Sequence, residues 1–91
     1  MKLSYTPKAL DELDEVLTYI VEQSPGGARR VQRRLQTVID LLVDHPYAGQ
    51  STSEPRLRRI VAAPYPYLVY YEVKADEVII IGVRHAARRQ R

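Results

Sequence analysis

The sequence contains no cysteine, which excludes disulfide bonds and thiolate chemistry. No apolar run approaches the roughly 20 residues that a membrane-spanning helix needs. The N-terminus also lacks the basic segment and the apolar stretch of a secretion signal. We therefore expect a cytoplasmic protein that makes no contact with a membrane.

Residues that build metal and cofactor sites are also scarce. The only histidines are His45 and His85, which lie far apart in the sequence and have no carboxylate cluster beside them, so a metal site is not expected. Gly26-Gly27 precedes a helical segment but lacks the lysine and the spacing of a nucleotide-binding loop. No serine stands in a nucleophile-elbow pattern. We expect neither a metal nor another cofactor.

The length of 91 residues predicts a single domain, residues 1–91, with a core too small to enclose a deep cavity. Two amphipathic helices are predicted in its first half. Thr6-Pro7 marks the start of the first helix and Ser24-Pro25 repeats the signal, each with an N-cap residue followed by proline. Apolar residues then recur at helical spacing as far as Asp44. Short strands are expected at Lys2–Tyr5, before the helices, and around residues 58–61.

The last third of the chain is rich in β-branched and aromatic residues and predicts a β-hairpin. A two-residue turn at Ala75-Asp76 would place Lys74 opposite Glu77 as an opposite-charge pair. In that register both faces of the hairpin are largely apolar. One face carries Tyr67, Val69, Tyr71, Val73, Val78, Ile80, Gly82 and Arg84, and the other carries Leu68, Tyr70, Ile81 and Val83.

An antiparallel sheet that is covered on one side normally alternates apolar with polar residues. Since both faces of this hairpin are apolar, we expect each face to pack against another element or a partner. The helices can cover only one side. We therefore predict an α+β fold in which an N-terminal strand and a two-helix hairpin accompany a small antiparallel β-sheet, with the helices on one face. The other face is left for a partner protein.

The net charge of +3 conceals a segregated distribution. The first predicted helix is mainly acidic and the second mainly basic, a pattern that ion pairs between the helices would explain. Seven arginines flank the predicted sheet: Arg56, Arg58, Arg59, Arg84, Arg88, Arg89 and Arg91. Clustered guanidinium groups suit phosphates and carboxylates, so a nucleic acid, a nucleic-acid-associated protein or an acidic peptide would each fit as a partner.

The order of these features resembles the RelE/ParE toxin superfamily, and more narrowly its ParE, or plasmid-stabilisation, branch. The resemblance rests on short motifs in a shared order: Ser24-Pro25, His45-Pro46-Tyr47-Ala48-Gly49, Leu57-Arg58, Tyr67-Leu68-Val69-Tyr70 and Arg84-His85-Ala86-Ala87-Arg88. It implies the toxin half of a bacterial type II toxin–antitoxin pair. It also implies a cognate antitoxin whose C-terminal segment wraps the toxin.

Two mechanisms occur among proteins of this superfamily. ParE-like members are taken to poison DNA gyrase without catalysis, whereas RelE-like members resemble ribosome-dependent mRNA endoribonucleases. In RelE-type ribonucleases an arginine precedes the Leu-Val-Tyr of the strand, and here Tyr67 stands in that place, while Ala86 and Ala87 replace a usual basic residue. The resemblance therefore favours the gyrase poison. The ribonuclease and a non-toxic module that binds nucleic acid or protein stay open as alternatives.

Three sets of residues follow from these hypotheses. The predicted target-binding residues are Arg58, Arg59, Arg84, His85, Arg88 and Arg89. If the protein is a ribonuclease, the predicted catalytic residues are His85, Arg59, Arg84 and Arg88, because histidine alone titrates near neutrality and arginines would stabilise the developing charge. The predicted antitoxin-binding residues are Tyr67, Val69, Tyr71 and Ile80.

Overall fold

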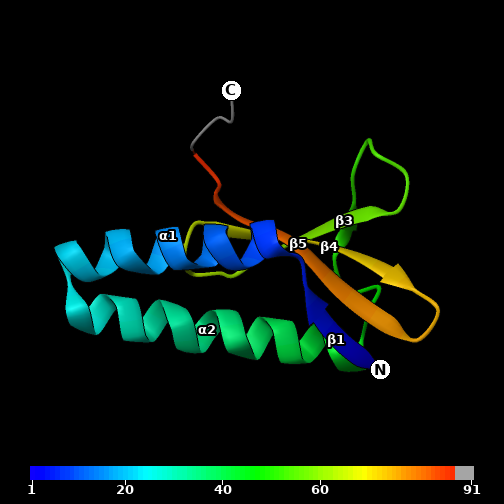
Figure 1. Ribbon diagram of the computed structural model, residues 1–91, viewed down its shortest axis with the longest axis horizontal. Coiled ribbons are helices and arrows are strands. Elements are labelled where there is room, and N and C mark those ends of the chain that lie inside the picture. The colour runs from blue at the N-terminus through cyan, green and yellow to red at the C-terminus, as the bar shows by residue number, and fades with distance from the viewer. Residues whose placement is uncertain (88–91) are drawn as a thin grey trace.

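The computed structural model describes residues 1–87 (Figure 1). Its elements are β1 (Lys2–Tyr5), α1 (Pro7–Gln23), α2 (Pro25–Asp44), β2 (Gln50–Ser51), β3 (Leu57–Val61), β4 (Tyr67–Lys74) and β5 (Glu77–His85). The five strands form one sheet in the order β1-β5-β4-β3-β2. Neither of the two helices in this part of the chain is long and apolar enough to cross a membrane.

The predicted α+β fold is confirmed, with differences in the details of the sheet. Figure 1 shows α1 and α2 running side by side, with β5 next to α1. Strands β2 to β5 pair antiparallel, as expected, but β1 runs parallel to β5 along Glu77–Ile80. The helical hairpin separates β1 from β5, so no tight turn forces the two strands to be antiparallel. The sheet is therefore mixed, and β2 is a short strand between α2 and β3 that the sequence analysis did not predict.

Both helices begin at the residues that the sequence indicates. Thr6 Oγ1 accepts a hydrogen bond from the Ala9 N–H at 3.0 Å, and Ser24 Oγ accepts one from the Gly27 N–H at 3.1 Å. Each cap satisfies a backbone donor that has no partner within its helix, and the proline that follows needs none. The chain therefore turns directly from α1 into α2.

The hairpin of β4 and β5 contains a β-bulge that the sequence analysis did not anticipate. Lys74 pairs with Glu77 as predicted, and Tyr71 pairs with Ile80, but Tyr70 pairs with Gly82. Ile81 is thus an extra residue, and every later residue of β5 changes face relative to the predicted register. The shift moves Val83 and His85 to the side of Val69 and Tyr67, and it moves Arg84 to the side of Leu68.

The helices cover the sheet face that was expected to be open. Tyr67 is 8% exposed, and Val69, Tyr71 and Ile80 are 0% exposed, because all four pack in the core beside the apolar stripe of α2. The sequence analysis expected these four residues to form a free surface for the antitoxin. Because they are buried under the helices, that prediction named the wrong face of the sheet. The pattern of two apolar faces was correct, but it could not tell which face the helices would select.

The opposite face of the sheet carries no helix in the part of the chain that the structure describes. We call it the open face. Its residues alternate with the core positions of β3, β4 and β5: Leu57, Arg59, Val61, Leu68, Tyr70, Glu72, Ile79, Ile81 and Arg84. Most are half-buried, and Val61 is 48% exposed. A largely apolar surface of this kind is typical of a binding face.

The phenol of Tyr5 on β1 has a shifted pKa. Burial raises the pKa of its phenol above the ordinary value of 10.0, and the negative charge of Asp40 on α2 raises it further. The folded state thus favours the neutral phenol. The stability that this preference contributes is present below about pH 10 and is lost as the pH rises through the higher pKa of the folded protein.

The Tyr71 hydroxyl ties the sheet to the segment after α2. It donates to the carbonyl oxygen of Pro46 at 2.8 Å and accepts from the N–H of Gly49 at 2.9 Å. Gly49 is itself buried, and a Cβ at that position would lie 2.5 Å from the Tyr71 hydroxyl oxygen and 2.7 Å from the carbonyl oxygen of Arg59. The close approach of the Gly49 segment to β3 and β4 thus requires glycine.

We expect Tyr71→Phe to destabilise the protein by about 1–3 kcal/mol, because it leaves two backbone groups without their hydrogen-bond partner. Urea unfolding measures the change. Tyr47→Phe is the matched control, since Tyr47 is 67% exposed and the loss of its hydroxyl should change stability by less than about 0.5 kcal/mol. Equal stabilities of the two variants would contradict this role of the Tyr71 hydroxyl.

We expect Gly49→Ala to destabilise the protein by about 1–3 kcal/mol, because the added methyl group overlaps two neighbouring atoms. Gly26→Ala is the control. Its Cβ would meet only the Arg30 Nη1 atom at 3.5 Å, an ordinary contact, and alanine favours the helix by up to about 1 kcal/mol. Thermal unfolding of both variants tests the prediction, which fails if Gly49→Ala unfolds at the temperature of the unmodified chain.

Candidate functional site

The structure divides the predicted target-binding residues between the two faces of the sheet. Arg58 and His85 pair with Tyr71 and Tyr67 and so lie on the helix-covered side. The side chains of Arg59 and Arg84 belong to the open face. The two remaining predicted residues, Arg88 and Arg89, lie outside the described part of the chain. The four described residues therefore do not form one continuous cluster.

Arg58 has a structural role. Its Nη2 group donates to the carbonyl oxygens of Gly49 at 2.9 Å and Tyr47 at 3.4 Å, and its guanidinium carbon lies 5.2 Å from the centre of the Tyr47 ring. The Nε atom is buried without a hydrogen-bond partner. These contacts hold the segment after α2 against β3, so Arg58 is not free to bind a target.

Arg59 and Arg84 instead flank an aromatic ring on the open face. Arg59 pairs with Tyr70 across β3 and β4, and the guanidinium carbon of Arg84 lies 5.2 Å from the centre of the Tyr70 ring. This distance is within the range of a cation–π interaction. We call Arg59, Tyr70 and Arg84 the arginine–tyrosine row. Two guanidinium groups beside a phenol ring suit a carboxylate, a phosphate or a planar group of a partner.

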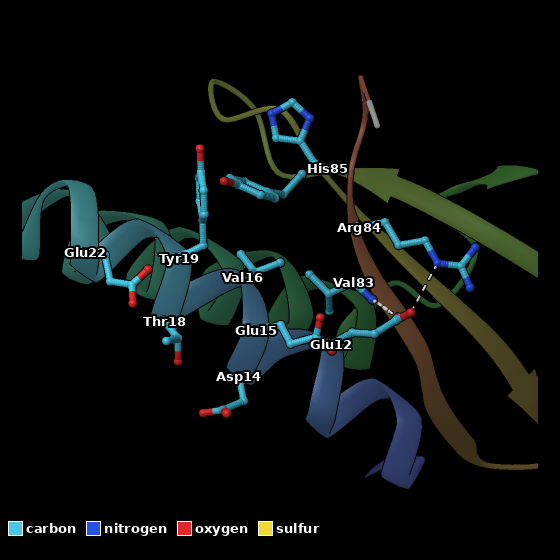
Figure 2. A pocket seen from close by; sticks show the side chains of 11 residues that line it. Glu12, Asp14, Glu15, Val16, Thr18, Tyr19, Glu22, Val83, Arg84 and His85 are labelled. Atoms are coloured by element: carbon cyan, nitrogen blue, oxygen red, sulfur yellow. Dashed lines mark hydrogen bonds and ion pairs between the residues drawn. The ribbon is translucent and has the colours of Figure 1, made fainter. Parts of the chain in front are cut away.

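A cleft of about 540 Å³ lies between α1 and the end of β5 (Figure 2). One wall consists of side chains of α1, and the other consists of Tyr67, Val83, Arg84 and His85. The wall on α1 is acidic: Glu12, Asp14, Glu15 and Glu22 all contribute to it. The cleft therefore presents mainly negative charge to any molecule that enters it.

His85 lies in this cleft with part of its imidazole ring already engaged. Its Nδ1 atom accepts a hydrogen bond from the Ala87 N–H at 3.0 Å, which requires the lone pair on that nitrogen. The ring meets the Tyr67 ring edge to face, with centres 5.3 Å apart and an interplanar angle of 87°. A nitrogen that accepts the Ala87 N–H cannot also take a proton from a substrate. Only Nε2 is left for proton transfer.

Among the described residues, the predicted ribonuclease residues do not converge on one point. His85 and Arg84 both line the cleft, but the guanidinium group of Arg84 is bound by Glu12 and lies over Tyr70, and Arg59 belongs to the open face. The fourth residue, Arg88, lies outside the described residues. Cleavage of RNA needs the proton-transfer group and the cations around the same phosphate. The acidic wall of the cleft would also repel the phosphates that had to approach His85. The described side chains therefore suit binding better than phosphoryl-transfer chemistry.

His45 and the remaining acidic residues form no second centre. His45 ends α2, and its backbone N–H donates to the carbonyl oxygen of Leu41 at 2.7 Å. His45 is thus the C-cap residue of α2. Across residues 1–87, no group of three or more histidine, aspartate or glutamate side chains comes together as metal ligands do.

The sequence analysis missed a contact between α1 and β5. Glu12 reaches across from α1, and its carboxylate binds both the backbone of Val83 and the side chain of Arg84 (Figure 2). One signal could have indicated this contact, since a glycine within a strand pattern, here Gly82, often marks a bulge or a close approach. Glu12 itself was one of many acidic residues on its helix and carried no signal of its own.

Known proteins resemble this chain over nearly its whole length. The family model described as "ParE toxin of type II toxin-antitoxin system, parDE" matches residues 3–90. A Caulobacter vibrioides protein named "Toxin RelE2" is 38% identical over 84 residues, which are 92% of this chain and 93% of that protein. A Sinorhizobium fredii protein named "Putative toxin Y4kP" is 35% identical over 85 residues, which are 93% of this chain and 88% of that protein.

A solved structure shares the fold. The chain superimposes with a TM-score of 0.81 on a chain of the structure titled "Chromosomal ParDE TA system from P. aeruginosa", with 24% sequence identity and coverage of 93% of this chain and 95% of that one. The structural match supports the arrangement of two helices on a five-stranded sheet. Together with the family model and the two relatives, it confirms the resemblance drawn from the sequence motifs. The chain belongs to the ParE toxin family of type II toxin–antitoxin systems, within the RelE/ParE superfamily.

Proposed function

We propose that this protein is a toxin that inhibits DNA gyrase by binding it, without catalysis of its own, and that a cognate antitoxin neutralises it. One observation carries the choice of mechanism. On the open face, Arg59 and Arg84 flank Tyr70, and neither histidine of the chain lies on that face. A surface of cations and an aromatic ring can bind a large target, but it lacks a group that transfers protons near neutrality.

The open face is the proposed target surface. Gyrase is a large complex of protein with DNA, and guanidinium groups bind both carboxylates and phosphates. A flat, largely apolar sheet face with two arginines needs no enclosed pocket for such a contact. Arg88 and Arg89, which the sequence analysis also assigned to the target-binding set, lie outside the described residues.

The antitoxin is proposed to cover this same open face. An acidic segment with apolar residues would match its composition, because Leu68, Ile79 and Ile81 offer apolar contacts while the arginine–tyrosine row offers positive charge. Neutralisation would then follow from competition, since the target and the antitoxin could not occupy the face together.

Induction of the chain without its antitoxin separates the proposed mechanisms. We expect growth arrest with broken chromosomal DNA and intact messages, which pulsed-field gels and primer extension can measure. Arg59→Ala should weaken the arrest about tenfold or more, as the loss of a central interface arginine does. His85→Gln should leave it unchanged, because proton transfer is not required.

Arg29→Ala is the control for the loss of one arginine, since Arg29 is exposed on α2, on the helical side of the sheet. It should arrest growth as the unmodified chain does. Cleaved messages together with an inactive but folded His85→Gln variant would overturn the proposal in favour of the ribonuclease. An induced, folded chain that never arrests growth would favour a non-toxic binding module.

A pair of valines tests where the antitoxin binds. Val61 on the open face is 48% exposed and Val21 on α1 is 47% exposed, so the two differ in position and hardly in exposure. We expect Val61→Glu to abolish co-purification with the co-expressed antitoxin, because a carboxylate would face its acidic segment, while Val21→Glu keeps the complex. If Val61→Glu retains the antitoxin and Val21→Glu loses it, the antitoxin binds the helices instead.

A further inference from the structure

The end of β5 runs along α1 and has no strand beside it on that side within the described residues. β1 pairs with β5 only as far as Ile80, where the Thr6 N–H donates to the carbonyl oxygen of Ile80 at 3.0 Å. The chain then leaves the sheet and enters α1. The Val83 N–H on the outer edge of β5 thus depends on α1 for its hydrogen-bond partner.

Glu12 of α1 supplies the partner. Its Oε1 atom accepts a hydrogen bond from the Val83 N–H at 3.0 Å, and its Oε2 atom lies 3.4 Å from Nε of Arg84. The two charged side chains are only 15% and 28% exposed, so water and salt screen this pair less than an ordinary surface pair. One carboxylate therefore binds both the strand backbone and the arginine next to it.

The absence of a side chain at Gly82 makes this contact possible. A Cβ at that position would lie 2.6 Å from Glu12 Oε1, which is closer than a Cβ atom approaches a non-bonded oxygen. Gly82 directly follows the bulge residue Ile81, and the bulge turns Arg84 toward the open face. The bulge at Ile81, the missing side chain at Gly82 and the Glu12 carboxylate together determine where the guanidinium group of Arg84 points.

We infer that Glu12 is a positioning residue, which holds Arg84 over Tyr70 as part of the surface that binds the target. The inference rests on the proposed function and deepens it. Glu12 engages Nε of Arg84, which leaves the terminal Nη groups for a carboxylate or phosphate of the partner. A surface arginine otherwise samples many rotamers, and ordering it on binding reduces affinity.

Glu12→Gln distinguishes positioning from a merely structural role. The amide oxygen of glutamine can still accept from the Val83 N–H, so the edge of β5 stays capped, while the ion pair with Arg84 is lost. Asp11→Asn is the matched control, because it removes the same charge from the exposed neighbouring residue of α1. Asp11→Asn should unfold at the temperature of the unmodified chain, and Glu12→Gln only slightly below it, because the backbone cap is kept while the ion pair is lost.

The first measurement does not depend on toxicity. In the full chain, made by cell-free synthesis with labelled arginine, the Nε–H signal of Arg84 is assigned by its loss in Arg84→Ala. We expect Glu12→Gln to speed hydrogen exchange at this group about tenfold, while Asp11→Asn leaves it unchanged. An unchanged rate of hydrogen exchange at the Arg84 Nε–H in Glu12→Gln would overturn the inference, even if the protein proves to be a gyrase inhibitor.

The second measurement is a double-mutant cycle on gyrase inhibition by the purified chain. Glu12→Gln alone should weaken inhibition about three- to tenfold, the effect of leaving one side chain to be ordered on binding. In the Arg84→Ala background it should have no further effect, because Glu12 acts through Arg84. Additive losses would overturn the positioning role. A chain that does not inhibit gyrase would instead overturn the proposed function, while the exchange measurement still decides whether Glu12 orders Arg84.

Discussion

The β-bulge at Ile81 shifts the pairing of β4 with β5 by one residue, and the placement of every later side chain of β5 depends on it. Because side chains alternate between the faces of a sheet, one extra residue exchanges the faces of all that follow. Val83 joins the core, His85 meets the Tyr67 ring edge to face beside the helices, and Arg84 turns to the open face. The separation of the histidine from the arginines is thus a consequence of backbone pairing.

Charge follows the same division. α1 contributes an acidic wall to the cleft around His85, while the open face carries Arg59 and Arg84 beside Tyr70. An anionic partner is therefore attracted to one face of the sheet and repelled from the cleft on the other side. Glu12 lies at the boundary, where its carboxylate satisfies the edge of β5 and binds Arg84. A small domain can bind a large partner selectively by this arrangement.

The structure rearranges the residues that the sequence analysis assigned to the site. The described chain has an apolar sheet face without a helix, and two of the predicted arginines, Arg59 and Arg84, lie on it. Tyr67, Val69, Tyr71 and Ile80, however, belong to the core, and Arg58 is engaged by the carbonyl oxygens of the segment after α2. Both faces of the predicted hairpin were apolar, so composition could not decide which one the helical stripes would cover.

The sequence by itself determined the elements whose signals are local. Thr6-Pro7 and Ser24-Pro25 start the helices because the caps act within one turn, and the turn between Lys74 and Glu77 depends only on its own residues. The tertiary structure alone decided the parallel pairing of β1, the bulge, the covered face and the reach of Glu12 to Val83, a residue 71 positions away. These features arise where segments distant in sequence compete for the same packing space, and no local pattern records the result of that competition.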